Sequence, residues 1–406
     1  MTGNEGLDGR AGMVFGVRPV KGAVNERTRW VVSEDKAALL RQSPGKWVVE
    51  EVELDEPKYG EVLVEMAAAG LCHSDDHFAQ GDLHVARLPV CAGHEGSGIV
   101  RKVGPGVQGL GVGDRVITSF IPACGKCRWC ATGMQNLCDN GAKIRAGDQL
   151  DGTFRMRTAD GEDVSTPALL GTFAEWQVYD QLSVVKIDSD IPLETACLVA
   201  CGVQTGFGSA TTAGNVQPGD VVIVAGVGGV GMNAVQGAYL SGAGHIIAVD
   251  PVADKRRWAL DFGATDGYES ISAAKDRVSE LTNGQGADVC ILTAGIVHND
   301  LISDGFHAIR KAGTLVVTGV SPDNEEALIP GLNANNLAMF QKRIQGALYG
   351  AKSPREAMPM LLDLYRAGKL KLDELITKTY ALDEINIGYD DMRNGRNIRG
   401  IIQFTR

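Results

Sequence analysis

Hydrophobic and polar positions along the chain change their spacing at about residues 200 and 346. Before residue 200, apolar and polar residues alternate in short segments, such as WVVEEVEL at 47–54 and EVLVEM at 61–66, and turn residues separate these segments. A period of two is typical of strands that bury one face. The first half of the chain is therefore predicted to be rich in β-strands and turns.

The region between about residues 203 and 346 has a different pattern, in which continuous apolar runs alternate with stretches of helical period. The runs ADVCILTAG and GTLVVTGV predict buried strands, and helices are predicted around 271–281 and 298–312. Strands that alternate with helices form a parallel sheet covered on both faces. We therefore predict an α/β fold with a doubly wound parallel sheet here.

The two ends of the chain have less regular patterns. After residue 346 the spacing predicts helices at 353–368 and 382–394 and a closing strand in RGIIQFT. Residues 1–33 show no convincing period, so we expect an N-terminal extension or flexible arm there.

Composition narrows the class of protein. The 406 residues are 44% hydrophobic and 22% charged, which suits two or three domains with sizeable cores. The formal charge of −11, without any Lys/Arg-rich run, argues against a nucleic-acid partner. No run reaches the roughly 18 apolar residues of a membrane helix, and the N-terminus lacks the order of a secretion signal. We expect a cytoplasmic protein with no nucleic-acid or membrane partner.

Clustered cysteines supply the first candidate chemistry. The segment ACGKCRWCATGMQNLCD contains four of the nine cysteines. Two successive C-x-x-C steps and a fourth cysteine can place four thiolates around one ion, for which zinc is favoured. An iron–sulfur cluster and a thioredoxin-like redox pair are the alternatives. Four thiolates leave no open position on zinc, so we expect a structural site made by Cys124, Cys127, Cys130 and Cys138.

A second set of metal ligands is predicted from three separate segments. GLCHSDDH contains Cys72, CAGHEGSG contains His94, and LVACGVQTGFGSA contains Cys201. The first two follow small residues at the end of apolar runs, where the backbone can present a side chain, and the third is in a similar setting. Alone, such residues are more often buried interior residues. Together, one histidine and two cysteines predict a catalytic-type zinc site with a free fourth position.

Glycine spacing predicts a dinucleotide site in the α/β region. An apolar run leads into a turn with Gly226, Gly228 and Gly231; a helical stretch follows, and a second apolar run ends at Asp250. These glycines suit a tight turn, close approach of a pyrophosphate and close helix–strand packing, respectively. Asp250 can accept from the adenosine ribose hydroxyls and would repel a 2′-phosphate, and Pro251 follows it in place of arginine. The pattern favours NAD over NADP.

With these motifs in this order, the chain resembles the zinc-containing, medium-chain alcohol dehydrogenases. The GHExxG stretch, the four-cysteine loop, GVGGVG and the IRGIIQF tail follow in family order from about residue 36. GLCHSDDH, SFIPACGKCRWC and LDGTFR...LLGTFAEW are similar to the bacterial N,N-dimethyl-4-nitrosoaniline-dependent branch, the nicotinoproteins, which keep the nicotinamide cofactor bound. The resemblance implies a GroES-like catalytic domain with two zinc sites at 34–202, an NAD-binding Rossmann domain at 203–346 and a return to the catalytic domain at 347–406.

The resemblance also implies roles for residues of the catalytic domain. Cys72, His94 and Cys201 match the catalytic zinc ligands, and the four clustered cysteines match the structural zinc. Ser74 matches the hydroxyl that bonds the alcohol, and His77 matches the imidazole that passes the proton of the alcohol on. Glu95 matches the carboxylate that can approach the metal, and Asp75 matches the acceptor that orients His94. Phe120 matches a side chain of the substrate pocket.

On the cofactor side, one position departs from the family pattern. Many members carry an arginine for the pyrophosphate directly after the first zinc cysteine, where this chain has His73, a weaker and pH-dependent cation. The residues matched to the cofactor are Thr205 and Val230 beside the nicotinamide, Gly226, Gly228, Gly229 and Gly231 in the phosphate turn, Asp250 and Lys255 on the adenosine ribose, and Arg399 on the pyrophosphate.

The resemblance implies an enzyme with two zinc ions per chain that reversibly oxidises small-molecule alcohols to aldehydes or ketones by hydride transfer to NAD, with an external electron acceptor if the NAD stays bound. It also implies a homodimer joined through the nucleotide domain, with a tetramer as the alternative. Thiol-dependent formaldehyde dehydrogenases are the second interpretation; their adduct-binding arginine falls on Ala142 at strict spacing, with Arg145 close by. A non-catalytic zinc- and nucleotide-binding protein is the third.

Overall fold

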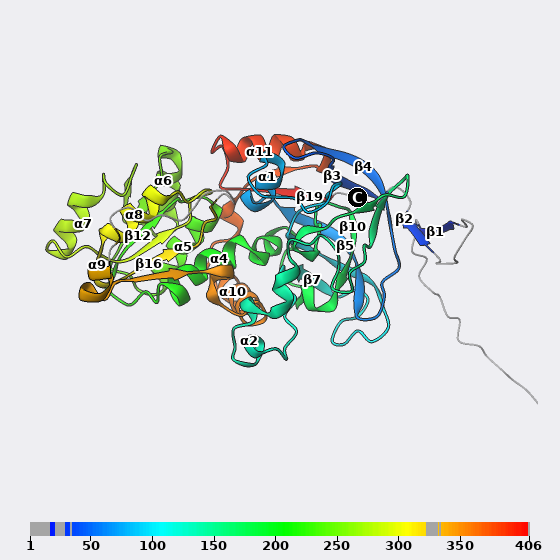
Figure 1. Ribbon diagram of the computed structural model, residues 1–406, viewed down its shortest axis with the longest axis horizontal. Coiled ribbons are helices and arrows are strands. Elements are labelled where there is room, and N and C mark those ends of the chain that lie inside the picture. Colours follow the sequence, from blue (N-terminus) through cyan, green and yellow to red (C-terminus); the bar gives the residue numbers. More distant parts are fainter. Residues whose placement is uncertain (1–16, 21–28, 33–34, 322–331, 333, 405–406) are drawn as a thin grey trace, which may run out of the picture.

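The computed structural model describes residues 17–20, 29–32, 35–321, 332 and 334–404, and these form a β-rich part and an α/β part that lie side by side (Figure 1). The predicted combination of a β-rich domain and a doubly wound parallel sheet is confirmed. The domain limits given above are our division of this continuous chain. No described helix is long and apolar enough to cross a membrane.

The β-rich part contains two sheets. The seven-stranded sheet has the order β11-β7-β6-β5-β19-β18, with β10 also paired to β5. Its central strand β5 (Glu61–Gly70) buries most of its length, because the run of alanines after EVLVEM continues the strand inward. The C-terminal strand β19 (Arg399–Gln403) pairs antiparallel with β5, so the end of the chain completes this sheet. The other strands are β6 (Glu95–Val103), β7 (Arg115–Thr118), β10 (Trp176–Asp180), β11 (Val184–Ile187) and β18 (Ile376–Tyr380).

The second sheet of this part has the order β1-β2-β4-β8-β9, with β3 also paired to β4. Its strands β1 and β2 form an antiparallel hairpin within the segment in which we predicted no regular structure, and Trp30 of β2 pairs with Leu54 of β4. The remainder of residues 1–33, on which the expectation of a flexible arm falls, lies outside the described residues. The strands are β1 (Val17–Val20), β2 (Arg29–Val32), β3 (Lys36–Leu40), β4 (Trp47–Leu54), β8 (Met156–Thr158) and β9 (Asp163–Val164).

The α/β part is built on a six-stranded sheet with the order β14-β13-β12-β15-β16-β17, in which every neighbouring pair is parallel. The first strand, β12, lies between β13 and β15, so the strand order reverses at its carboxyl end, where open α/β sheets bind dinucleotides. Its strands are β12 (Val221–Ala225), β13 (His245–Val249), β14 (Asp266–Tyr268), β15 (Ala287–Leu292), β16 (Ile309–Val317) and β17 (Arg343–Gly346).

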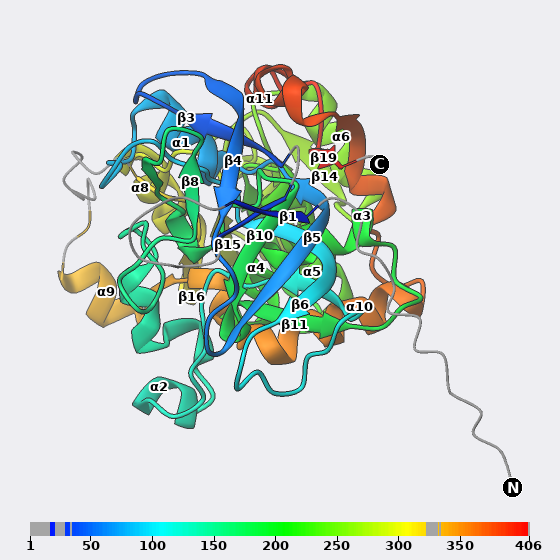
Figure 2. The same cartoon turned by 90° about the vertical axis from the view of Figure 1, so that its right-hand side faces the viewer.

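Helices cover the parallel sheet and join it to the β-rich part (Figures 1 and 2). Helices α5 (Gly229–Leu240), α6 (Ala253–Asp261), α7 (Lys275–Thr282), α8 (Asn299–Ala308) and α9 (Ala334–Phe340) belong to the α/β part. The remaining α-helices with described bounds are α1 (His73–Gln80), α2 (Arg128–Ala131), α3 (Leu193–Ala196), α4 (Gly202–Gly208), α10 (Pro354–Arg366) and α11 (Ile385–Arg393).

One predicted helix is too long. The helix expected at 298–312 ends at Ala308 as α8, and residues 309–312 already belong to β16. Ile309 pairs in parallel register with Ala287 of β15, and this pairing between strands overrides the local helical spacing.

Candidate metal centres and cofactor site

The four-cysteine loop forms one cluster, in a segment around α2 that projects from the body of the molecule in both views (Figures 1 and 2). The sulfur atoms of Cys124 and Cys130 are 4.0 Å apart, and those of Cys127 and Cys138 are 3.9 Å apart. Four sulfurs placed about 2.3 Å from a tetrahedral centre would be about 3.8 Å from one another. The donor set and its spacing therefore fit a closed zinc site.

Backbone amides surround these sulfurs. The amide of Cys124 donates to the sulfur of Cys138, and the amide of Cys127 donates to the sulfur of Cys124, both at 3.3 Å. A hydrogen bond from the backbone of Cys130 lowers the pKa of the Cys127 thiol to about 6. Backbone hydrogen bonds likewise lower the pKa of Cys124, whereas burial raises the pKa values of Cys130 and Cys138. Before metal binds, the loop therefore favours the thiolate, the form that binds zinc, at two of its four positions. All nine cysteines lie among the described residues and are free of disulfides.

The second predicted ligand set also comes together. The donor atoms of Cys72, His94, Glu95 and Cys201 all lie within 4.8 Å of one another, and all four residues are buried. Cys72 precedes α1 and Cys201 precedes α4, while His94 is followed directly by β6. Two sulfurs, one imidazole and one carboxylate are donors that zinc accepts in catalytic sites. This cluster fits a metal that binds three of them firmly.

Asp75 lies where it can orient His94. Its Oδ1 is 3.1 Å from Nδ1 of His94 and also accepts from the amide of Gly93 at 2.9 Å. A carboxylate on Nδ1 holds the proton there, so that Nε2 keeps its lone pair for the cluster. The structure therefore places Asp75 in the geometry of a residue that fixes a metal-binding histidine.

Glu95 connects the cluster with the rest of the site through Arg399. The two side chains form a buried ion pair, the amide of Gly202 donates to Oε1 of Glu95 at 2.9 Å, and Arg399 donates to the Leu71 carbonyl at 3.0 Å. A Cβ atom at Gly229 would overlap with the Arg399 side chain. Arg399 thus reaches from the metal cluster to the glycine turn of the α/β part.

The two predicted proton-transfer residues lie on α1, beside the cluster. Ser74 Oγ is 3.8 Å from the sulfur of Cys72. His77 is buried, with Nδ1 2.9 Å from the Asp82 carboxylate and Nε2 3.2 Å from the Gly295 carbonyl oxygen. The sequence did not single out Asp82 or Gly295. The glycine that ends α1 just before Asp82 is the only signal that could have pointed to the first of them.

Two aromatic rings adjoin the cluster. The Phe120 ring lies 5.8 Å from the His94 ring at 88°, and its other neighbour, the Tyr349 ring, is 4.0 Å away. Tyr349 is buried, and its hydroxyl donates to the Ala200 carbonyl. Phe120 was predicted to line the substrate pocket. Tyr349 was not predicted, because its position depends on packing of the C-terminal segment and has no motif of its own.

The glycine turn has the geometry that a dinucleotide requires. Gly226 follows β12 with a φ of +93°, and a Cβ there would overlap with the Ala294 backbone. A Cβ at Gly231 would overlap with the Gly226 carbonyl, whereas a Cβ at Gly228 would meet nothing within 4 Å. Open space beside Gly228, at the N-terminus of α5, suits an approaching phosphate. The residues present therefore fit the cofactor.

Asp250 lies at the end of β13, next to this turn. Its Oδ2 accepts from the amide of Val227 at 3.1 Å, and its Oδ1 accepts from the amide of Val252 at 2.9 Å. Each oxygen retains acceptor capacity for a ribose hydroxyl. Lys255 follows on α6 and is half-buried.

The remaining predicted cofactor residues are near the junction of the two parts. Thr205 Oγ1 is 3.9 Å from the sulfur of Cys201, and the Val230 carbonyl faces Gly206 where α4 and α5 pack closely. Burial lowers the pKa of His73 to about 4, so this imidazole is uncharged at neutral pH. It therefore does not reproduce the constant charge of an arginine at that position.

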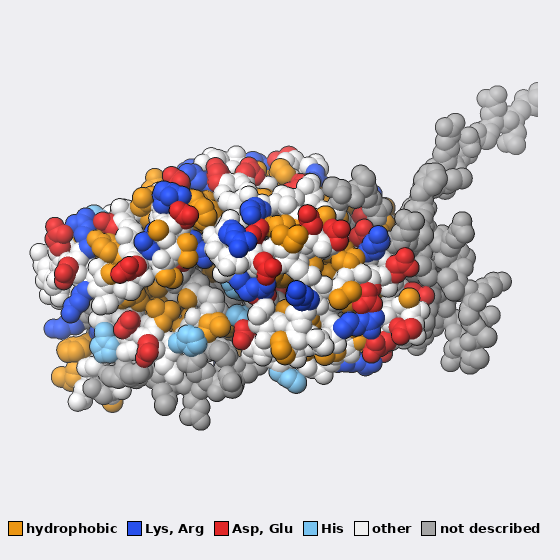
Figure 3. All heavy atoms as spheres, turned by 90° about the horizontal axis from the view of Figure 1, so that it is seen from above, with side chains coloured by type: hydrophobic (Ala, Val, Ile, Leu, Met, Phe, Trp, Pro, Cys, Tyr) orange, Lys and Arg blue, Asp and Glu red, His pale blue; other side chains and the backbone are white. Residues whose placement is uncertain are grey.

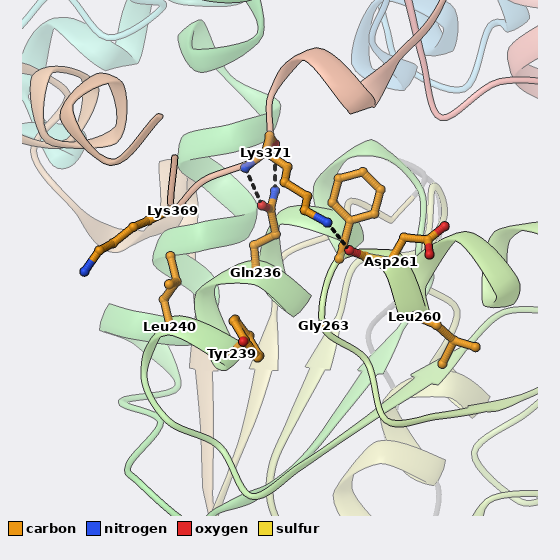
Figure 4. A pocket seen from close by; sticks show the side chains of 9 residues that line it. Gln236, Tyr239, Leu240, Leu260, Asp261, Gly263, Lys369 and Lys371 are labelled. Atoms are coloured by element: carbon orange, nitrogen blue, oxygen red, sulfur yellow. Dashed lines mark hydrogen bonds between the residues drawn. The ribbon is translucent and has the colours of Figure 1, made fainter. Parts of the chain in front are cut away.

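The surface and a pocket away from the predicted site residues have the following features. Figure 3 shows acidic and basic side chains interspersed on the face it presents. Figure 4 shows a pocket beside the C-terminal end of α5. There Nε2 of Gln236 donates to the Lys371 carbonyl at 3.0 Å, and the Lys371 amide donates to Oε1 of Gln236 at 2.8 Å. None of the predicted site residues lines this pocket.

Comparisons with known proteins agree with this geometry. Residues 58–189 match the family described as alcohol dehydrogenase GroES-like domain, and residues 229–366 match zinc-binding dehydrogenase. An NDMA-dependent alcohol dehydrogenase of Amycolatopsis methanolica is 50% identical over 91% of this chain and 99% of its own. Alcohol dehydrogenase B of Mycobacterium tuberculosis is 46% identical over 91% and 98%.

A solved structure, the benzyl alcohol dehydrogenase of Acinetobacter calcoaceticus, superposes with a TM-score of 0.83 at 30% identity, over 92% of this chain and 100% of its own. Sequence identity, coverage and shared architecture all point to one group of oxidoreductases. The chain belongs to the zinc-containing, medium-chain alcohol dehydrogenase family.

Proposed function

We propose that this protein oxidises alcohols to aldehydes or ketones at the Cys72–His94–Cys201 cluster. The observation that carries the proposal is the position of this cluster, with its donor atoms within 4.8 Å of one another and Arg399 joining it to the glycine turn. When bound, zinc acts as a Lewis acid that lowers the pKa of an alcohol hydroxyl, and NAD accepts the hydride.

Side chains of this protein would orient a zinc ligand, accept the proton of the alcohol and bind its apolar part. Asp75 orients His94; Ser74 would hydrogen-bond the hydroxyl of the alcohol, and His77 would take up its one proton. The Phe120 ring lies next to His94 and packs on the buried Tyr349 ring, and its aromatic surface suits the apolar part of an alcohol and excludes water. Glu95 balances the charge of Arg399 near the cofactor turn.

We further propose that NAD is the cofactor, that it stays bound between turnovers and that an external acceptor reoxidises it. Asp250 beside the glycine turn supports NAD, and the similarity to an NDMA-dependent relative supports retention. The test is to purify the protein without added cofactor, dialyse it, denature it and measure released nucleotide. About one NAD(H) per chain is expected. Release near zero would contradict retention and would direct assays to exchangeable NAD.

The same preparation tests the activity itself. Zinc-loaded protein is expected to contain two zinc ions per chain and to oxidise members of an alcohol panel with a nitroso dye as acceptor. Failure on every alcohol, both with the dye and with added NAD, would contradict the proposal. The thiol-dependent formaldehyde reaction gains no support from the relatives described above, which are alcohol dehydrogenases.

Assembly and compartment are also proposals. We infer a homodimer formed through the α/β part, because β17 is an edge strand of the parallel sheet and its residues are exposed. Apolar side chains exposed near this edge support it: Met339, Phe340, Ile344 and Leu348. Sedimentation at the mass of one or four chains would contradict a dimer. Nine free cysteines support a reducing compartment such as the cytoplasm.

A further inference from the structure

The turn that ends α1 brings Asp82 back onto His77. Helix α1 ends at Gln80, and Gly81 has a left-handed conformation with a φ of +85°. The amides of Gly81 and Asp82 both donate to the His77 carbonyl at 3.0 Å. The chain reverses within one helical turn, so the Asp82 carboxylate lies 2.9 Å from Nδ1 of His77. Because a side chain at Gly81 would be strained, this glycine sets the geometry.

The other ring nitrogen of His77 faces the α/β part. Its Nε2 lies 3.2 Å from the carbonyl oxygen of Gly295, which comes after β15, at the carboxyl end of the parallel sheet. Both ring nitrogens therefore face acceptors. A neutral imidazole carries one N–H and satisfies one of them, whereas a protonated ring satisfies both. The Asp82 carboxylate is the nearer acceptor and carries the charge, so it competes better for the single N–H of the neutral ring. Nε2 is then left facing the carbonyl and gains a hydrogen bond when it is protonated.

Asp82 differs from the other ionisable groups near this ring. The His77 side chain is 6% exposed and that of Asp82 is 35% exposed, so the carboxylate is partly solvated while the ring is not. Asp76, on the same helix, is paired with Arg393 at 2.6 Å. The His73 ring is 6.3 Å from the His77 ring, and a Cβ atom built at Gly295 would lie 3.3 Å from the His73 ring. Among these groups, Asp82 is the one in contact with His77.

We propose that Asp82 is a positioning residue for His77. It accepts the Nδ1 proton, which holds the neutral ring in the tautomer whose Nε2 has a free lone pair. One proton from the alcohol hydroxyl is then taken up at Nε2, the Nδ1 proton stays on the ring, and the Gly295 carbonyl accepts the new N–H. The negative charge of Asp82 stabilises the resulting imidazolium. The O–H bond of the alcohol breaks with its electron pair left on oxygen, the lone pair of Nε2 forms the new N–H bond, and no group is oxidised or reduced. The inference rests on the proposed function, since it assigns His77 as a proton acceptor.

The first test reads the ring directly. Nitrogen-15 spectra of the histidine rings of zinc-loaded protein are compared for the wild type, Asp82→Ala and Asp163→Asn, with His77→Gln used to assign the signal among seven histidines. Asp163 of β9 is the control, because it is a carboxylate of similar exposure, 31%, that pairs with Arg157 of β8. We expect a single Nδ1-protonated tautomer in the wild type and in Asp163→Asn, and a mixture in Asp82→Ala. An unchanged tautomer in Asp82→Ala would overturn the proposal.

The second test follows turnover. Asp82→Ala is expected to lower kcat about tenfold with an alcohol KM within about twofold of the wild type, and to raise the solvent deuterium isotope effect, because proton uptake becomes slower. Asp82→Glu is expected to recover part of kcat. A tenfold loss without any change in tautomer would indicate a merely structural role and overturn the proposal. If the wild type oxidised no alcohol, the proposed function would fail, while the spectra would still decide whether Asp82 fixes the ring.

Discussion

Both metal-ligand clusters contain cysteine sulfurs, but their ligands come from different parts of the chain. The four cysteines between residues 124 and 138 come from one loop, and two of them are half-buried. Cys72, His94 and Cys201 come from three distant segments and are all buried. A local cluster can assemble with its loop alone, whereas the distant one requires the β-rich part and α4 to be in place. The sequence separation of the ligands thus predicts that the four-cysteine cluster stabilises its own loop, whereas the buried cluster forms only when the whole fold has formed.

The neighbours of the two clusters differ as well. Backbone amides surround the four sulfurs of the loop, and its donors are all thiolates. In the buried cluster, the Asp75 carboxylate hydrogen-bonds His94, and the Glu95 carboxylate pairs with the guanidinium of Arg399. A zinc ion held by four thiolates is closed, while one held by two sulfurs and an imidazole has a position for substrate. The difference in function lies in the non-cysteine residues.

The largest predicted effect comes from removing one ligand of the buried cluster. Cys72→Ser is expected to lower kcat by at least about 10³-fold, because the Lewis acid loses a firm ligand next to the reacting hydroxyl. Zinc content should fall from two ions to one per chain, and the melting temperature should stay within a few degrees of the wild type, since the loop site is intact. Kinetics, metal analysis and calorimetry on one preparation measure all three. A variant with full activity and one zinc would show that the roles of the clusters are reversed.

Removing a ligand of the loop cluster is expected to have the opposite profile. Cys127→Ser should lower the apparent melting temperature by about 5–10 °C, because a structural metal contributes folding free energy. The kcat of the folded protein at 20 °C should stay within about threefold of the wild type, since the loop does not touch the reacting groups. Lys126→Ala is the control, because Lys126 is exposed in the same loop and is not a ligand. Loss of activity at an unchanged melting temperature would contradict a structural role for this cluster.

This contrast also explains what could be predicted from the sequence. The four-cysteine cluster follows from spacing, because its donors are near one another in the chain. The glycine turn follows in the same way, since its roles depend on β12 and α5, which flank it directly. The distant set needed three separate segments to be considered together, and the resemblance to a family assigned the roles of Asp75 and Glu95.

Residues placed by tertiary packing were missed. Tyr349 reaches Phe120 from the C-terminal segment, and Gly295 reaches His77 from beyond β15, so no local pattern connects either pair. The end of α8 was misplaced because the pairing of Ile309 with β15 decides it. The β1 and β2 segments lack a strong alternation, and Trp30 of β2 pairs with Leu54 of β4, 24 residues away. In each case the determining contact is distant in sequence.

The smallest predicted effect concerns Asp391, whose hydrogen bonds hold α11 against the sheet that carries Arg399, next to the buried cluster. Asp391 on α11 accepts from Lys378 at 2.7 Å and from the Tyr380 hydroxyl at 2.8 Å, and both belong to β18, beside the strand that carries Arg399. The hydrogen bond from Lys378, followed by that from Tyr380, lowers the pKa of Asp391 from 3.8 to about 2. Because the folded pKa is below the unfolded one, the carboxylate stabilises the fold above about pH 4, and this contribution is lost as the pH falls through 2.

Asp391→Asn is therefore expected to lower the free energy of unfolding at pH 7 by about 1 kcal/mol, a value reduced because solvent screens the half-exposed Lys378. Urea unfolding of wild type and variant at pH values from 7 down to 2 measures the difference, and protonation of the metal ligands affects both proteins alike. The difference should shrink as the pH falls below 4. A difference that is equally large at pH 2 would mean that Asp391 stabilises α11 by packing and not by charge, and that this side of the buried cluster does not depend on the ionisation of Asp391.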